Sequence, residues 1–190
     1  MSTKKDKFSK KDKKYMSLAL SLASARHGLT GENPSVGCVI VKNDEIISIG
    51  QTGYNGTPHA EFNAIKNSNE NLEGAKMYVT LEPCSHYGKT PPCTNIIIKN
   101  KIKEVVYAVE DIDKKVKGKT LKILQSKNIL VKRYLLKNEV NKFYTPYFFN
   151  KKNNLPYVTG KIATSKNNLI YSKGTKKITD IHSDKLTHFL

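Results

Sequence analysis

Several features are scarce in this sequence. It has no tryptophan, only three cysteines, and no run that approaches eighteen consecutive apolar residues. The last feature excludes a transmembrane helix, and an odd number of cysteines does not make a disulfide framework. No apolar segment follows the N-terminal lysines, so no secretory signal peptide is expected. We therefore expect a cytoplasmic protein without membrane contact, whose cysteines serve thiol or metal chemistry in a reducing compartment.

Arginine is also scarce. Among 33 basic residues only Arg26 and Arg133 are arginines, although the formal net charge is +17. Recognition of nucleic-acid phosphates usually draws on arginine, so this composition does not favour nucleic acid as the main partner. Residues 15–113 carry eight basic and eleven acidic residues, and the excess of positive charge lies outside that segment. The basic flanks leave RNA or an acidic protein as an alternative partner.

The order of apolar patterns predicts an α/β fold. A hairpin comes first, and strands then alternate with helices, which predicts a three-layer domain with a mixed five-stranded sheet between helices. Expected strands cover 36–41, 46–50, 77–81, 105–109 and 129–134; expected helices cover 15–27, the region around 62–65, 94–100 and the region around 121–126.

The composition divides the chain into three parts. Residues 1–14 form a Lys-rich tail that we expect to be disordered, and 15–149 form the α/β domain. The run Lys151-Lys152-Asn153-Asn154 after an aromatic cluster predicts a boundary, followed by a strand over 155–159. The 41 residues of 150–190 are too few for a stable domain, so we expect the truncated start of a second one.

One group of residues points to metal chemistry: His59, Cys84 and Cys93. One imidazole and two thiolates suit zinc and leave a fourth position for water. His59 and Cys93 both precede helical patterns, and a helix N-terminus favours the thiolate form of cysteine. On a helix, Glu61 would point about 200° away from His59, so we interpret it as a proton shuttle and not as a ligand.

Other interpretations of the same residues exist. A lone H-x-E pair is common at helix starts, and a buried cysteine is most often a small core residue. Cys38 lies in an apolar strand pattern and is expected to be such a core thiol. A purely structural zinc site, with His86 as its fourth ligand, remains open.

The same residues resemble a known family. The runs NPSVGCVIV (33–41), GTPHAE (56–61) and VTLEPCSHYGKTPPC (79–93) resemble, in this order, motifs of the riboflavin biosynthesis deaminase/reductase family. Its N-terminal half is a zinc-dependent, cytidine-deaminase-like domain. The eight-residue gap between the two cysteines is the specific part, because cytidine and tRNA deaminases have only two residues there. The resemblance covers about 14–149, and 156–165 is more weakly similar to the first strand of the family's reductase.

This resemblance implies a function. The family's deaminase half removes an amine hydrolytically from 2,5-diamino-6-ribosylamino-4(3H)-pyrimidinone 5′-phosphate, using Zn²⁺ on the three ligands named above and Glu61 as general acid and base. It also implies substrate contacts from Asn33, His86, Lys89 and Asp111. Lys89 would contact ribose or phosphate, since a point charge suits a phosphate.

Three departures from the family pattern stand out. Thr52 occupies the place where many members have a histidine, which puts that substrate contact in doubt. The family's Asp-Pro-Asn-Pro turn reads Asp111-Ile112-Asp113-Lys114, and Asn167-Asn168 replaces an Asp-Gly in the reductase start.

The expected partners follow from the same resemblance. NADPH would be a cofactor only with a complete reductase domain, and a separate reductase and a homo-oligomer are both compatible with the sequence. Two other functions stay open: a deaminase-like zinc fold that binds RNA or a protein, and deamination of another nucleotide.

Overall fold

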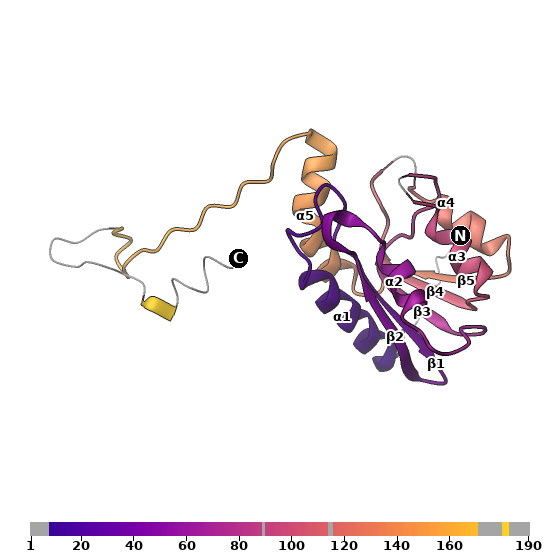
Figure 1. The fold of residues 1–190 in the computed structure, drawn as a ribbon. Coiled ribbons are helices and arrows are strands. Elements are labelled where there is room, and N and C mark those ends of the chain that lie inside the picture. Colours follow the sequence, from indigo (N-terminus) through magenta and orange to yellow (C-terminus); the bar gives the residue numbers. More distant parts are fainter. Residues whose placement is uncertain (1–7, 89, 114–115, 171–179, 183–190) are drawn as a thin grey trace, which may run out of the picture. The chain divides into compact units, whose positions relative to one another are not determined.

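The computed structural model describes residues 8–88, 90–113, 116–170 and 180–182 (Figure 1). The chain divides into two compact units, Met1–Pro156 and Tyr157–Leu190. The sheet, its helices and the site described below all belong to the first unit. Within the described ranges, residues 155–159 form no strand, so that prediction is wrong. None of the described helices is long and apolar enough to cross a membrane.

The sheet has five strands in the order β2-β1-β3-β4-β5. Strand β1 pairs antiparallel with both β2 and β3, while β3–β4 and β4–β5 pair parallel. The predicted mixed five-stranded sheet is therefore confirmed. The strand bounds are β1 Gly37–Lys42, β2 Glu45–Gln51, β3 Lys76–Leu81, β4 Glu104–Val109 and β5 Leu130–Arg133.

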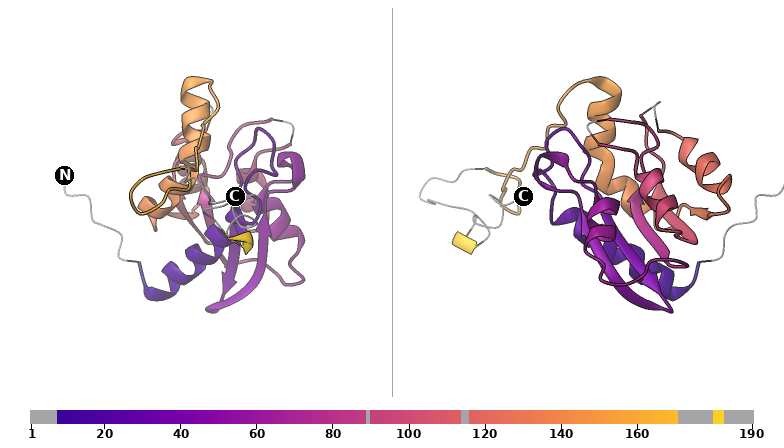
Figure 2. Two further views of the ribbon diagram at one scale, coloured as in Figure 1. Left: turned by 90° about the vertical axis from the view of Figure 1, so that its left-hand side faces the viewer. Right: turned by 45° about the vertical axis from the view of Figure 1, so that its right-hand side comes forward.

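Helices cover both faces of this sheet (Figures 1 and 2). Helices α1 (Lys10–Ser24) and α5 (Lys137–Asn153) lie on one face; α2 (Ala60–Lys66), α3 (Cys93–Lys99) and α4 (Lys119–Gln125) lie on the other, and the short 3₁₀ turn η1 spans Tyr54–Gly56. Every residue of β4 is buried, as expected of a strand with a helical layer on each side. The three-layer architecture is confirmed.

The N-terminal boundary differs from the prediction. Helix α1 begins at Lys10 and not near Tyr15, so residues 10–14 are helical and not disordered. Ser9 and Asp12 form a capping box, in which each side chain accepts a hydrogen bond from the other's backbone N–H. Asp12 also accepts a hydrogen bond from the Tyr78 hydroxyl of β3. The capping box and the contact with Tyr78 stabilise helix in this segment although it is rich in lysine. Residues 1–7 lie outside the described ranges.

The C-terminal boundary differs as well. Helix α5 runs through Asn153, past the boundary expected between 149 and 150, and it accommodates Pro146. The hydroxyl of Tyr144 donates to the carbonyl of Ser35 at 2.8 Å and lies 2.7 Å from the hydroxyl of Thr80 in β3. The aromatic cluster is therefore a helix packed on the sheet. The interpretation of the following residues as a truncated reductase stays a prediction.

Helix α2 sits directly on β2 at Gly50. A Cβ atom there would lie 2.3 Å from both the carbonyl oxygen of Ala60 and the backbone nitrogen of Ala64. Only glycine at position 50 lets the backbone of α2 come this close to β2. This close packing holds the first turns of α2 against the sheet. His59 and Glu61 are positioned by that helix start.

We expect Gly50→Ala to force α2 away from the sheet and to lower the free energy of unfolding by about 1–3 kcal/mol. Denaturant unfolding measures this effect. Gly160→Ala is the matched control, since no atom lies within 4 Å of its added Cβ. Equal stability of the two variants would contradict the packing described here.

Candidate metal centre and its pocket

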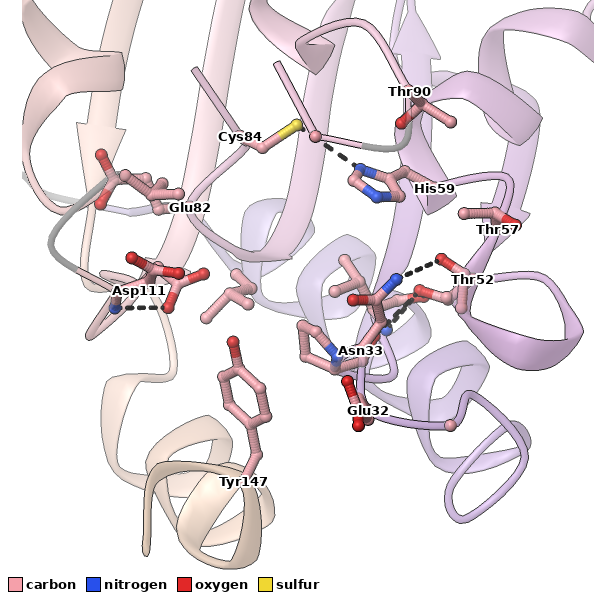
Figure 3. A pocket seen from close by; sticks show the side chains of 18 of the residues that line it. Glu32, Asn33, Thr52, Thr57, His59, Glu82, Cys84, Thr90, Asp111 and Tyr147 are labelled. Carbon is pink, nitrogen blue, oxygen red and sulfur yellow. Dashed lines mark hydrogen bonds between the residues drawn. The ribbon is translucent and has the colours of Figure 1, made fainter. Parts of the chain in front are cut away.

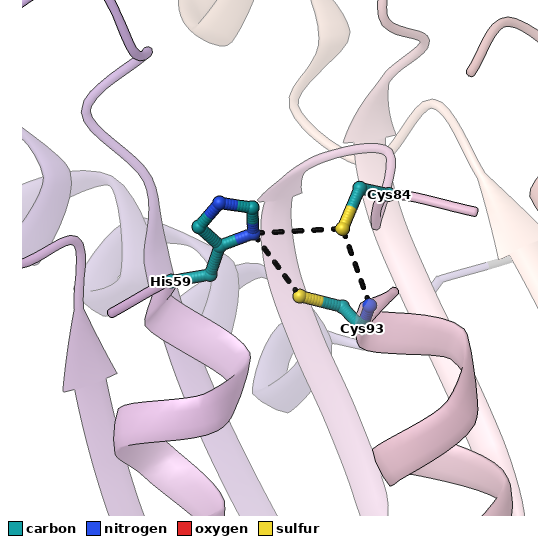
Figure 4. Close-up of side chains that lie close together, drawn as sticks. All are labelled: His59, Cys84 and Cys93. Atoms are coloured by element: carbon teal, nitrogen blue, oxygen red, sulfur yellow. Dashed lines mark hydrogen bonds between the residues drawn. The ribbon is translucent and has the colours of Figure 1, made fainter. Parts of the chain in front are cut away.

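Three segments at one end of the sheet bring His59, Cys84 and Cys93 together (Figure 4). His59 is the N-cap of α2, Cys84 follows the carboxyl end of β3, and Cys93 is the first residue of α3. The predicted position of His59 and Cys93 at helix starts is confirmed. In α/β sheets the carboxyl ends of strands are the usual place for ligand sites.

The distances within this group suit zinc. Nδ1 of His59 lies 3.3 Å from Sγ of Cys93 and 3.5 Å from Sγ of Cys84. A tetrahedral ion about 2.3 Å from sulfur and about 2.0–2.1 Å from nitrogen would hold such atoms about 3.5 Å apart. The three ligand atoms all lie within 4.8 Å of one another. The donor set and its spacing therefore fit a zinc ion.

The surroundings of Cys84 favour its thiolate. Hydrogen bonds from the Cys93 side chain, from His59 and from the Cys93 backbone N–H hold the pKa of Cys84 below its ordinary value, although burial opposes this. The same contact with Cys84 raises the pKa of Cys93. The backbone nitrogen of Cys93 lies 3.2 Å from the Cys84 sulfur. Thiolate is the form that binds metals, so Cys84 is poised as a ligand at neutral pH.

Two neighbouring groups do not belong to the cluster of ligand atoms. Among the described residues, neither Glu61 nor His86 joins the three. Glu61 lies in the first turn of α2 and is buried, and it lines the same pocket as His59 and Cys84. Burial raises the pKa of Glu61 to about 7; the negative charge of Cys84 adds to this rise and His59 opposes it. A carboxyl group with this pKa exchanges protons readily at neutral pH.

The pocket beside this cluster has a volume of about 400 Å³ (Figure 3). Of the four residues expected to contact a substrate, Asn33, His86 and Asp111 line it. The fourth, Lys89, lies outside the described residues. Nδ1 of His86 is buried and has no hydrogen-bond partner in the described part of the chain.

Cys38 has a different environment. It lies in β1, is fully buried and packs in the hydrophobic core. Burial raises the pKa of its thiol, which keeps it protonated. The expectation of a core thiol is confirmed.

Helix α5 contributes two pocket residues that the sequence did not reveal, Tyr147 and Lys151. Glu82 was missed as well: it follows β3, is buried, and accepts a hydrogen bond from the backbone N–H of Gly118 at 3.1 Å. The helical spacing of Val140, Tyr144 and Tyr147 was the available signal for α5, but Pro146 obscured it.

Comparison with known proteins agrees with this geometry. Residues 9–109 match the family model described as the cytidine and deoxycytidylate deaminase zinc-binding region. A diaminohydroxyphosphoribosylamino-pyrimidine deaminase of Buchnera aphidicola subsp. Schizaphis graminum is 41% identical over 146 residues, which cover 77% of this chain and 99% of that protein. The chain belongs to the riboflavin biosynthesis deaminase family.

Two longer proteins show how much of the family's length is present. The riboflavin biosynthesis protein RibD of Aquifex aeolicus is 41% identical over 94% of this chain and 51% of its own length. A deaminase/reductase structure from Thermotoga maritima superposes with a TM-score of 0.82 at 34% identity, over 94% of this chain and 52% of that one. The chain thus spans about half the length of these two relatives.

The structure accounts for one departure from the riboflavin deaminase pattern. Thr52 lines the pocket, but its hydroxyl accepts a hydrogen bond from the backbone N–H of Val36 at 2.9 Å and lies 3.3 Å from the carbonyl of Pro34. It therefore ties down the loop that carries Asn33. The amide nitrogen of Asn33 donates in turn to the carbonyl of Gly56 at 3.0 Å.

The altered turn after β4 is also ordered locally. Oδ1 of Asp111 accepts a hydrogen bond from the backbone N–H of Asp113 at 2.9 Å, which closes an Asx turn without either proline. Asp111 is buried, and burial raises its pKa. Both aspartates line the pocket.

We expect the chain to bind about one zinc ion, and Cys93→Ser to lose most of it, because the hydroxyl is a much poorer zinc ligand than a thiolate. Elemental analysis after gel filtration measures the occupancy. Cys38→Ser is the control and should keep the metal. Full occupancy in Cys93→Ser would remove Cys93 from the ligand set.

Proposed function

We propose that this chain carries out the hydrolytic, zinc-dependent removal of ammonia from 2,5-diamino-6-ribosylamino-4(3H)-pyrimidinone 5′-phosphate in riboflavin biosynthesis. The observation that carries the proposal is the combination of the His59, Cys84 and Cys93 cluster with a buried Glu61 in one pocket. The identity to the Buchnera deaminase along nearly all of that protein's length supports the choice of substrate.

Glu61 performs the proton transfers in this proposal. His59, Cys84 and Cys93 would hold a zinc ion, which would make a water molecule acidic enough to lose a proton at neutral pH. Glu61 would take one proton from the attacking water and give it to a ring nitrogen of the pyrimidine. It would then take the second proton from the hydroxyl now bound to the ring carbon and pass it to the departing amine, which leaves as ammonia. A pKa of about 7 lets the same carboxyl group accept and donate protons in turn.

The pocket residues orient the pyrimidine. The amide nitrogen of Asn33 is engaged by Gly56, so we assign its carbonyl oxygen to the N–H groups of the substrate. We assign His86, which lines the same pocket, to the bound ligand as well. Asp111 faces the same pocket from the turn after β4.

Reduction of the product is a separate step. We assign it to a complete NADPH-dependent reductase domain, either on the same protein or on a separate partner, because residues 157–190 are too few to hold a dinucleotide. The proposed setting of both reactions is the cytoplasm.

Ammonia release by the zinc-loaded chain tests the proposal. The pyrimidinone phosphate should yield ammonia, and treatment with a chelator should abolish the reaction. Deoxycytidylate serves as the competing substrate and should react far more slowly. A zinc-bound chain that releases no ammonia but retains RNA at physiological salt would instead support a binding module.

Glu61→Gln should keep zinc and lose about 10²–10⁴-fold in turnover, since it preserves the shape of the side chain and removes the proton carrier. Steady-state ammonia release and metal content are measured on the same preparation. Turnover within a few-fold of the parent would show that another group moves the protons.

Lys89→Ala should weaken the phosphorylated substrate more than its dephosphorylated analogue, because the expected contact joins two charges and the analogue lacks one. The ratio of the two kcat/KM values measures the effect. Comparable losses for both compounds would exclude Lys89 from phosphate binding.

A further inference from the structure

One face of α5 leads from the core to the edge of the pocket. Tyr144 is buried, Tyr147 is half-buried and Lys151 is exposed, at a spacing that keeps all three on one side of the helix. Tyr147 and Lys151 both line the pocket. In Figure 3, Tyr147 lies across the pocket from His59 and Cys84. Lys151 is one helical turn farther along and is exposed to solvent.

Acidic side chains outnumber lysine and arginine in the described lining of this pocket. It contains five carboxyl side chains: Glu32, Glu61, Glu82, Asp111 and Asp113. Lys151 is the one lysine or arginine among the described lining residues. A phosphorylated ligand is repelled by this lining wherever carboxylates are ionised, and Lys151 offers it an attractive charge.

The charge of Lys151 lies close to two other residues that line the pocket, Tyr147 and Asp111. Nζ of Lys151 lies 5.8 Å from the centre of the Tyr147 ring. Burial raises the pKa of Asp111, and the positive charge of Lys151 opposes that rise. The ammonium group is therefore close enough to influence the turn after β4 while it stays accessible to a ligand.

We propose that Lys151 binds the phosphate of the substrate and so selects the phosphorylated form. This assignment rests on the proposed function. The reacting carbon of the pyrimidine must lie at the metal cluster, and the phosphate is at the other end of the molecule, beyond the ribosyl group. In a ligand held this way the phosphate lies away from the metal cluster, and Lys151 is the cation that the described lining offers it.

The test compares Lys151→Met, Lys151→Arg and Lys152→Met in zinc-loaded chains. Ammonia release is measured on the pyrimidinone 5′-phosphate and on its dephosphorylated form. Lys151→Met should raise KM for the phosphate about 10-fold or more and change kcat by less than about twofold, since it removes one charge-assisted contact. The loss of kcat/KM should be several-fold larger for the phosphate than for the dephosphorylated compound, and Lys151→Arg should keep most of the phosphate preference.

Lys152→Met is the matched control, because it removes the same charge one residue away and Lys152 does not line the described pocket. It should behave like the parent. Equal losses on both compounds would overturn the proposal and show that Lys151 acts through Asp111; an unchanged phosphate preference, or the same effect from Lys152→Met, would overturn it too.

Ammonia release by the parent chain distinguishes a failure of the Lys151 assignment from a failure of the proposed function. If the parent releases ammonia from the phosphate and Lys151→Met keeps the preference, Lys151 alone is wrongly assigned. If the parent releases none from either compound, the proposed function fails and the role of Lys151 fails with it.

Discussion

The site depends on the meeting of one nitrogen and two sulfur atoms that come from three separate segments. Each segment is held by the sheet: α2 sits on β2 at Gly50, Cys84 follows β3, and the N–H of Cys93 at the start of α3 faces the Cys84 sulfur. A small displacement of any segment would spoil the spacing of about 3.5 Å that a tetrahedral zinc ion requires. The mixed sheet is therefore the frame on which the chemistry depends.

Burial also changes the pKa values of carboxyl groups that line the pocket. Glu61 is placed by the same helix start as His59, and its removal from water brings its pKa to about 7. Asp111 is buried too and has a raised pKa. Burial therefore raises the pKa of both carboxyl groups, which line the same pocket. Lys151 of α5 is the one lysine or arginine among the described lining residues, and we propose that it binds the phosphate of the substrate.

The sequence predicted the sheet and the metal cluster because both have short-range signatures: alternating apolar strands, and His and Cys residues next to helix starts. Helix α5 was not predicted, because Pro146 and the following Lys and Asn residues resemble a linker, whereas packing of Tyr144 against Thr80 and Ser35 stabilises a helix. The pocket roles of Tyr147 and Lys151 depend on where that helix packs, which the helical spacing of its residues does not reveal.

The central claim is that the metal centre has three protein ligands and one position open to water. X-ray absorption at the zinc edge of the zinc-loaded chain tests it most directly. The account predicts two sulfur neighbours at about 2.3 Å and two lighter neighbours at about 2.0–2.1 Å, of which only one shows the multiple scattering of an imidazole. A second imidazole, as expected if His86 closed the site, would contradict a catalytic centre and indicate a structural one.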